Sequence, residues 1–174
     1  MTLLTSAAPN VYVALGSNLG NPAEILCDAM IQLQQFSTDP LQRSSLWLST
    51  PVHCPPGSPR FVNAVVALAP LPDETPETLL EKLQAIERDF GRLPKRILNE
   101  PRPLDLDLIA FGAEVRAGEH LTLPHPRAHL RRFVLQPLSE IAPTLILPRQ
   151  AKPVCQLLTE LRTSEILDRV QAAG

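Results

Sequence analysis

The sequence has little of several features that mark common classes of protein. Its formal net charge is -2 over 174 residues, so no overall positive charge favours nucleic acid, and any anion site must be local. Cysteine is scarce as well: the chain has three, Cys27, Cys54 and Cys155, and none forms a C-x-x-C pair. This usage favours free thiols in a reducing compartment over a disulfide framework or a zinc site.

Long apolar runs and targeting signals are also missing. No run approaches the roughly 20 apolar residues that cross a bilayer, so nothing indicates a membrane protein. The opening stretch MTLLTSAAPN has neither a charged start nor a long apolar core, and we interpret it as a loose tail rather than a signal peptide. Together with the free thiols, these absences predict a cytoplasmic protein.

The composition that is present suits one domain. Hydrophobic residues make up 44% of the chain, and a chain of this length buries about 70% of its unfolded surface. The 19 prolines are spread along the sequence, which predicts a loop-rich protein without low-complexity segments. We therefore expect residues 1–174 to form a single domain, with residues 1–9 and roughly 165–174 as loose tails.

Apolar spacing predicts the order of the elements. Asn21-Pro22 and Thr75-Pro76 are typical helix starts, and Asp39-Pro40 and Gly91 are typical ends. Strands are expected at 11–15, 41–49, 61–68 and 104–111. The resulting order β-α-β-β-α-β is that of a ferredoxin-like α/β (α+β) sandwich, with both helices on one face of an antiparallel sheet and the other face free for ligands.

The rest of the chain gives a weaker pattern. Residues 120–137 are expected to be irregular and to carry a basic cluster. An extra C-terminal helix is expected near residues 153–162, and a weak helical pattern follows near 164–172.

Asp105 and Asp107 lie in the apolar run LDLDLIAF. Side chains alternate along a strand, so both carboxylates share a face, together with Ile109 and Phe111. They could be two solvated acids on an exposed face, but Asp is depleted in strands and the rest of this face is apolar. Paired carboxylates on a stiff strand suit Mg²⁺, which binds a few carboxylates together with substrate phosphates.

A basic loop precedes these acids. Arg92, Lys95 and Arg102 stand in GRLPKRILNEPRP, where prolines at 94, 101 and 103 restrict the backbone. The planar forks of arginine match phosphate oxygens, although a solvated charged loop with structural prolines is the other reading. Beside the acids, these cations predict a site for metal and polyphosphate together.

Three further segments could line a site. Phe61 and Asn63 share a strand face, and the ring and amide could hold a flat heterocycle, or could simply be a core Phe beside an edge Asn. Asn18 lies in GSNLG, which lacks the Lys of a P-loop and reads first as an ordinary turn, with a ligand-edge role as the alternative. The segment PHPRAHLRRF contains basic residues and Phe133 without any acid; it fits an anion-contacting loop with an aromatic wall better than a zinc site.

Taken together, these motifs resemble one family. The landmarks are GSNL at 16–19, TP at 50–51, FVN at 61–63, IERDFGR at 86–92, NEPRPLDLD at 99–107 and PHPR at 124–127 leading to FVLQPL at 133–138. In combination they are specific for 6-hydroxymethyl-7,8-dihydropterin pyrophosphokinases of folate biosynthesis, and the match runs to about residue 148. The resemblance implies a ferredoxin-like sandwich and transfer of pyrophosphate from ATP to the pterin hydroxymethyl group, releasing AMP.

The resemblance also implies a role for each motif. Two Mg²⁺ ions would bind Asp105 and Asp107 and bridge the phosphates of the co-substrate ATP. Glu87 would act indirectly. The catalytic residues would be Arg92, Arg102, Asp105, Asp107 and His125. The ATP contacts would be Arg92, Lys95, Arg102, His125 and Arg131, and the pterin contacts would be Asn18, Thr50, Phe61, Asn63 and Phe133.

The implied partners are small molecules, with neither nucleic acid nor membrane, and the implied state is a monomer that could associate with other folate enzymes. Some loop positions depart from well-known members: Pro94, Asn99 and Pro126 stand where basic or aromatic residues are common. Two other classes stay open from the residues alone. One is a non-catalytic ferredoxin-like ligand-binding module, and the other is a metal-dependent nuclease or phosphatase that uses the D-x-D pair.

Overall fold

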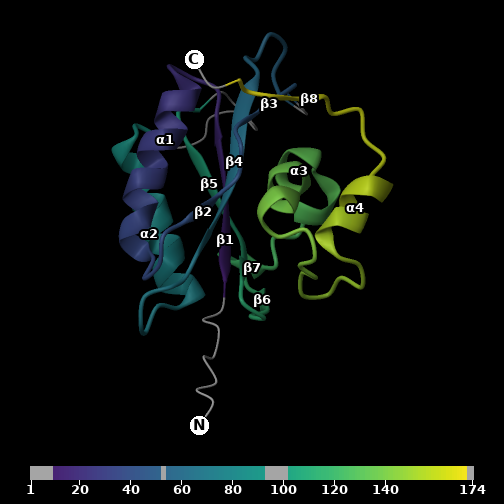
Figure 1. Ribbon diagram of the computed structural model, residues 1–174. Coiled ribbons are helices and arrows are strands. Elements are labelled where there is room, and N and C mark those ends of the chain that lie inside the picture. Colours follow the sequence, from purple (N-terminus) through teal and green to yellow (C-terminus); the bar gives the residue numbers. More distant parts are fainter. Residues whose placement is uncertain (1–9, 52–53, 93–101, 172–174) are drawn as a thin grey trace.

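The computed structural model describes residues 10–51, 54–92 and 102–171, and its centre is an antiparallel sheet (Figure 1). The strand order is β5-β1-β4-β3-β8, and β2 also pairs with β4. The strands of this sheet are β1 (Val11–Ser17), β2 (Gln42–Arg43), β3 (Trp47–Ser49), β4 (Phe61–Leu68), β5 (Asp105–Phe111) and β8 (Leu167–Arg169). A separate hairpin pairs β6 (Arg116–Ala117) with β7 (Thr122–Leu123).

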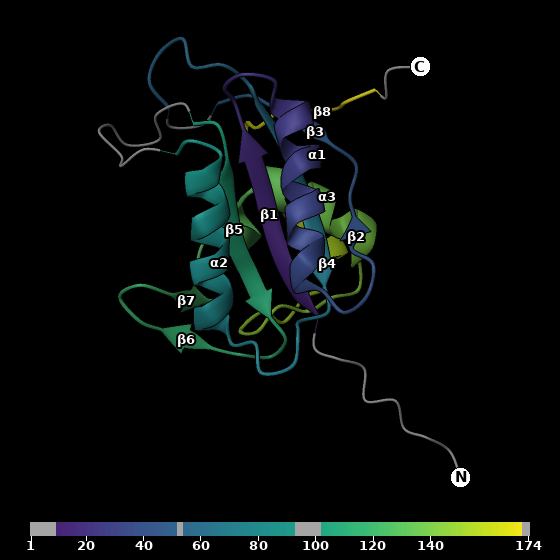
Figure 2. The same ribbon diagram turned by 90° about the vertical axis from the view of Figure 1, so that its left-hand side faces the viewer.

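Helices cover both faces of the sheet. On one face, α1 (Pro22–Leu33) and α2 (Pro76–Asp89) lie side by side in front of β1 and β5 (Figure 2). On the other face lie α3 (Arg132–Ile141) and α4 (Val154–Glu160), seen to the right of the sheet in Figure 1. Two 3-10 turns, Gln34–Phe36 and Ala128–Leu130, extend α1 and precede α3. No helix in the described ranges is long and apolar enough to cross a membrane.

The predicted helix starts are present. Pro22 opens α1 after Asn21, and Pro76 opens α2 after Thr75. The Thr75 hydroxyl accepts a hydrogen bond from the Thr78 N–H at 3.1 Å, and the Thr78 hydroxyl accepts one from the Thr75 N–H at 3.0 Å. This reciprocal cap fixes the start of α2, the helix that leads to Arg92.

Two apolar layers sandwich the sheet. The alternation along β1 sends Val11, Val13 and Leu15 toward α1 and α2, whereas Tyr12 and Ala14 face α3 and α4. The second layer includes Val134, Leu135 and Leu138 of α3, each at most 2% exposed. The sheet is thus buried on both faces along much of its length.

The structure confirms the ferredoxin-like order β-α-β-β-α-β and corrects three local predictions. The strand expected at 41–49 is two short strands, β2 and β3, separated by an irregular stretch. The region 120–137, expected to be irregular, includes the start of α3. The expectation that one sheet face is free is also wrong, because α3 and α4 cover part of it. The sequence did not predict α3, because Pro137 lies inside its apolar pattern and basic residues precede that pattern.

The chain end differs from the prediction too. The weak helical pattern near 164–172 is instead a strand, β8, which pairs antiparallel with β3. Residues 165–171, expected to belong to a loose tail, are therefore held at the edge of the sheet. The side chains of β8 are mostly exposed, so this conformation depends on backbone pairing with β3 and not on apolar spacing.

A bulge on β5 decides which side chains accompany the two aspartates. Asp107 lies opposite Ala14, but the register shifts after Leu108, so that Ala110 lies opposite Tyr12. Ile109 and Ala110 both contribute to the layer under α3, and Phe111 turns to the layer under α1 and α2. The prediction that Phe111 shares the face of Asp105 and Asp107 is therefore wrong, while Ile109 does share it.

Candidate active site

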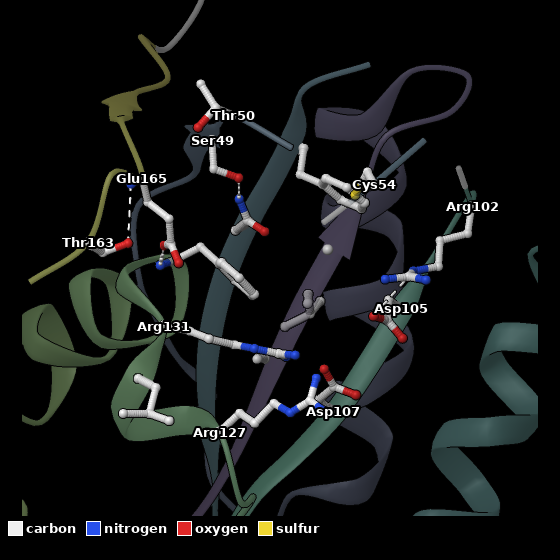
Figure 3. A pocket seen from close by; sticks show the side chains of 17 residues that line it. Ser49, Thr50, Cys54, Arg102, Asp105, Asp107, Arg127, Arg131, Thr163 and Glu165 are labelled. Atoms are coloured by element: carbon white, nitrogen blue, oxygen red, sulfur yellow. Dashed lines mark hydrogen bonds and ion pairs between the residues drawn. The ribbon is translucent and has the colours of Figure 1, made fainter. Parts of the chain in front are cut away.

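A cavity of about 660 Å³ opens on the α3 face of the sheet, beside the end of β1 and the starts of β4 and β5 (Figure 3). Its walls come from sheet strands, from the segment that leads into α3 and from the chain after α4. The lining residues are Ala14, Leu15, Gly16, Ser49, Thr50, Cys54, Phe61, Asn63, Arg102, Asp105, Asp107, Arg127, Leu130, Arg131, Phe133, Thr163 and Glu165.

The floor is made of small residues beside the aromatic and amide pair. Gly16 lies opposite both Asn63 on β4 and Asp105 on β5. A Cβ at position 16 would lie 3.5 Å from Asn63 Oδ1 and 3.8 Å from a Phe61 ring carbon. Glycine thus leaves room for a flat ligand above the strand, between the amide and the acids.

Asn63 is held in one orientation although it lines the cavity. Its amide nitrogen donates to Ser49 Oγ at 2.7 Å and to the Trp47 carbonyl at 3.3 Å, and the residue is 4% exposed. These bonds turn the amide oxygen toward Gly16. A fixed amide of this kind can accept a hydrogen bond from the edge of a heterocycle, because its oxygen has a defined direction.

Two aromatic rings line the same cavity, and an arginine guanidinium lies over each of them. The Arg102 guanidinium carbon lies 5.7 Å from the centre of the Phe61 ring, and that of Arg131 lies 5.3 Å from the centre of the Phe133 ring. Such contacts hold a cation over the ring face. Aromatic surface and positive charge therefore meet on both sides of the cavity.

The carboxylate of Asp105 is engaged by two arginines. Arg92 Nη1 lies 2.5 Å from Asp105 Oδ1, and Arg102 Nε lies 3.3 Å from Asp105 Oδ2. Arg92 also pairs with Glu87 Oε2 at 3.1 Å, and Glu87 Oε1 accepts from the Leu106 N–H at 2.8 Å. Glu87 thus braces both Arg92 and the start of β5, which accords with the indirect role implied for it. Burial raises the pKa of Glu87.

The carboxyl group of Asp107 is buried beside a second acid, Asp105, and both conditions disfavour its charged form. Burial raises its pKa to about 7, and the charge of Asp105 adds to the rise, while Arg131 and Arg102 oppose it. Figure 3 shows Arg127 and Arg131 reaching toward this carboxylate from the α3 side. Removing water from one of two neighbouring carboxylates favours its neutral form, so this pair would gain from a cation placed between them.

The donor chemistry fits a hard cation that completes its shell with substrate oxygens. Asp105 and Asp107 face one cavity from one strand. Within the described ranges, no group of three or more His, Cys, Asp and Glu side chains is placed to hold a metal by itself. Mg²⁺ commonly binds through one or two carboxylates together with phosphates, and these two aspartates suit that arrangement.

Arg102 has unused donors. Within the described part of the chain its buried Nε and Nη1 atoms make no hydrogen bond, since the ion pair between Nε and Asp105 is not aligned as one. Buried guanidinium donors without an acceptor are costly. An anion in the cavity would supply the missing acceptors.

Asn18 holds Arg102 from behind the cavity wall. Its side-chain oxygen accepts from the Arg102 N–H at 2.8 Å, its own N–H donates to the Arg102 carbonyl at 3.2 Å, and its side-chain nitrogen donates to the Pro59 carbonyl at 3.3 Å. Asn18 is 2% exposed and does not belong to the lining. This placement differs from the predicted pterin contact, because backbone groups occupy the amide.

His125 also lies just outside the lining. Its backbone N–H donates to the Ile109 carbonyl at 2.8 Å, and its ring Nδ1 accepts from the Arg127 N–H at 3.2 Å. Burial, with Arg131 adding to the effect, lowers the pKa of His125 to about 4. The ring is therefore neutral at pH 7, and the bond to Nδ1 places its proton on Nε2, which can donate to an anion.

The cavity thus brings together most of the predicted residues: Thr50, Phe61, Asn63, Arg102, Asp105, Asp107, Arg131 and Phe133 line it, and Arg92 pairs with Asp105 from behind. Lys95, like the departures at positions 94 and 99, lies outside the described residues. Sequence reasoning missed the lining role of Ser49, Thr163 and Glu165, and it gave Arg127 only as part of an anion-contacting segment. Arg127 was visible within PHPR, but nothing in the sequence signalled Thr163 or Glu165.

Comparison with known proteins decides the family. The sequence model of the 7,8-dihydro-6-hydroxymethylpterin-pyrophosphokinase (HPPK) family matches residues 12–143. The chain belongs to this family. The resemblance drawn from the sequence motifs is confirmed, and so is the pyrophosphokinase activity in folate synthesis that it implied.

HPPK relatives cover most of the chain. It is 42% identical over 151 residues to the 2-amino-4-hydroxy-6-hydroxymethyldihydropteridine pyrophosphokinase of Haemophilus influenzae, covering 86% of this chain and 89% of that protein. It is 42% identical over 139 residues to the enzyme of the same name from Pseudomonas aeruginosa, covering 79% of this chain and 83% of that protein.

Solved HPPK structures share the fold. Wild-type HPPK-DHPS of Plasmodium falciparum matches with a TM-score of 0.67 at 11% sequence identity. That match covers 87% of this chain and 44% of the solved chain, so this protein spans less than half of that longer protein. At this identity the likeness supports the fold and not the roles of individual residues.

Proposed function

We propose that the cavity transfers the pyrophosphoryl group of ATP to the hydroxymethyl group of 6-hydroxymethyl-7,8-dihydropterin and releases AMP. The observation that carries this assignment is the shared cavity itself. It contains the acid pair Asp105 and Asp107 and, beside it, the aromatic and amide pair Phe61 and Asn63. A site for metal and phosphate thus adjoins a site for a flat heterocycle.

The pterin would lie between the Phe61 and Phe133 rings, over Gly16. Asn63 would read the edge of the ring, since its amide is held by Ser49 and Trp47. Thr50 would line the same end of the cavity. This placement directs the hydroxymethyl arm toward β5, where the acids lie.

The phosphates of ATP would lie against the cationic side. Arg102 offers buried donors that have no acceptor within the described residues. Arg131 lines the cavity, and Arg92 adds charge through its pair with Asp105. Neutral His125 would donate from Nε2. Lys95, on the same basic loop, is proposed as a further phosphate contact on the strength of the family resemblance.

Asp105 and Asp107 would hold two Mg²⁺ ions. When bound, these ions would neutralise phosphate charge and make the acceptor hydroxyl more acidic. The raised pKa of Asp107 supports this role, because a cation would relieve the repulsion from Asp105. The chain's own part is then to align the acceptor and donor and to keep Arg102 near the developing charge.

The chemistry balances as one displacement. The pterin hydroxyl oxygen forms a bond to the β phosphorus of ATP, and the bond from that phosphorus to the oxygen shared with the α phosphate breaks. AMP leaves with that oxygen, and the hydroxyl proton goes to solvent. Transfers of this kind depend mainly on positioning and charge neutralisation, and we assign no side chain as general base.

One assay tests this assignment against the two other classes. Protein, ATP, Mg²⁺ and 6-hydroxymethyl-7,8-dihydropterin are mixed, and AMP is measured by chromatography with and without the pterin. AMP that requires pterin is the expected result. ATP hydrolysis without pterin would favour a phosphatase, and absence of turnover would favour a binding module.

For the protein as a whole, we propose a single domain that acts as a monomer in the cytoplasm. The small-molecule substrates need no partner surface. Association with other folate enzymes is supported by relatives in which the matching region is part of a longer chain, such as the folate synthesis bifunctional protein of Arabidopsis thaliana, where the match spans 29% of its length. Light scattering during size-exclusion chromatography would measure the mass directly.

A further inference from the structure

The chain after α4 forms one wall of the cavity. Residues 161–169 run from α4 back across the end of α3 to the sheet edge, where β8 pairs with β3 (Figures 1 and 3). Thr163 and Glu165 of this segment line the cavity. The family match ends at residue 143, so neither it nor the sequence motifs assign a role to this segment, which we call the C-terminal strap.

Glu165 joins the strap to the first turn of α3. Its carboxylate oxygen Oε2 accepts from the Phe133 N–H at 3.1 Å, and the Arg132 N–H also bonds to this carboxylate. Such N–H groups have no partner within their own helix, and a carboxylate there is favourable. Glu165 is 9% exposed, and burial raises its pKa despite these bonds. Glu165, a buried acid from a distant segment, therefore caps the first turn of α3 at the backbone of Phe133.

Other contacts fix the strap beside the acceptor end of the cavity. The Thr50 N–H donates to the Ile166 carbonyl at 3.3 Å, and the Arg60 side chain pairs with Asp168 at 2.9 Å. The strap thereby contacts Thr50, which lines the cavity, and Arg60, which directly precedes Phe61.

The far end of the strap is tied to the other end of α3. Arg169 Nη2 donates to Ser45 Oγ at 2.5 Å, and Ser45 Oγ donates to Glu140 Oε2 at 2.7 Å. The Trp47 indole nitrogen donates to Glu140 Oε1 at 2.6 Å. Both ends of α3 are thus connected to the sheet edge, one through Glu165 and the other through Glu140.

We propose that Glu165 is a positioning residue for the acceptor: it sets Phe133 at the distance from Phe61 that a pterin ring requires. The proposal rests on the proposed pterin contact of Phe133. A capped first turn fixes the backbone of Phe133, and that backbone fixes the direction of its ring. Without the cap, the aromatic slot loses its defined width, while the phosphate contacts on β5 and Arg102 stay in place. Arg131, the N-cap residue of α3, is the phosphate contact nearest to this change.

The test compares Glu165→Ala with Glu165→Gln. The Gln side chain can still accept from the Phe133 N–H, whereas Ala cannot. Glu160→Ala, which removes an exposed acid from α4, is the matched control. Calorimetry measures binding of the pterin and, separately, of a non-hydrolysable ATP analogue, and steady-state assays give kcat and the KM for pterin.

We expect Glu165→Ala to weaken pterin binding roughly tenfold, the scale of losing one buried hydrogen-bond partner. It should raise the KM for pterin with little change in kcat and affect binding of the ATP analogue far less, since Arg131 is the phosphate contact whose charge acts on Glu165. Glu165→Gln should restore most of the pterin affinity, and Glu160→Ala should match the wild type. If Glu165→Ala fails to fold, Glu165→Asp, which withdraws the carboxylate by one carbon, should show the same selective loss.

Unchanged pterin binding in a folded Glu165→Ala or Glu165→Asp variant would overturn the proposal. So would equal losses for pterin and the ATP analogue, because these would mean general destabilisation. The proposed reaction can fail independently: a wild-type protein that binds pterin but makes no AMP would refute the reaction and leave the binding comparison valid.

Discussion

Asp105 and Asp107 stand two residues apart on β5, and the charge of the first helps burial to raise the pKa of the second to about 7. Arg92 and Arg102 both pair with Asp105, so the two acids differ in their surroundings although they share a face. Without a bound cation, two charged aspartates at these positions therefore make the folded protein less stable than an uncharged pair would.

Asp107→Asn should stabilise the metal-free protein at neutral pH while it abolishes turnover. The folded pKa of Asp107 is raised from 3.8 to about 7. The contribution of Asp107 to the free energy of unfolding is therefore fully present below about pH 4, where the carboxyl is protonated. It is lost as the pH rises through 7 and the buried group ionises. In EDTA, the Tm difference between variant and wild type should grow from pH 5 to pH 8, where each kcal/mol corresponds to about 2–4 °C.

Adding Mg²⁺ with an ATP analogue should reverse that order, because the variant has lost one of the two carboxylates that would hold the cations. Asp28→Asn, an exposed acid on α1, is the control and should leave Tm nearly unchanged. A variant that is less stable than the wild type at pH 8 in EDTA would contradict the electrostatic account.

Asn63→Ala should weaken pterin binding chiefly. The loss of a buried hydrogen-bonding group costs about 1–3 kcal/mol, which is roughly 5- to 150-fold in Kd. Binding of an ATP analogue by the same variant is the internal control and should not change. Calorimetry that finds an unaltered pterin affinity would remove Asn63 from the acceptor site.

Arg102→Ala should lower kcat more than it weakens ATP binding. Its buried donors lack acceptors in the described structure, and a donor used as charge develops is worth about 100- to 1000-fold in kcat. Arg43→Ala, an exposed arginine on β2, should behave like the wild type. A large rise in the KM for ATP with kcat preserved would show that Arg102 only binds the substrate.

His125 should stay neutral throughout the working range. Burial and the nearby Arg131 lower its pKa from 6.5 to about 4. Its contribution to stability is therefore complete above pH 6.5 and is lost as the pH falls through 4. An NMR titration of the metal-free protein should show one imidazole titrating near pH 4, and that signal should vanish in His125→Ala. A histidine signal from residue 125 that titrates near 6.5 would contradict the burial.

Much of the site was predictable from the sequence, because its key pairs lie on single strands. Alternation along a strand places Asp105 beside Asp107 and Phe61 beside Asn63 without knowledge of the fold. The same rule failed at Phe111, since the bulge after Leu108 depends on the pairing with β1 and leaves no local signal. Asn18 was placed in the ligand site on its motif, but its backbone partners Arg102 and Pro59 come from distant loops.

The sequence by itself determined the strand and helix order through residue 111, the acid pair and the basic loop, because each depends on local spacing, caps and charge. Only the tertiary structure decided that α3 and α4 cover the second face of the sheet. It also decided that the chain end becomes β8 and that Glu165 reaches the Phe133 N–H. These features depend on backbone pairing and on contacts between residues far apart in the chain. Neither produces a periodic pattern in the sequence from which it could be predicted.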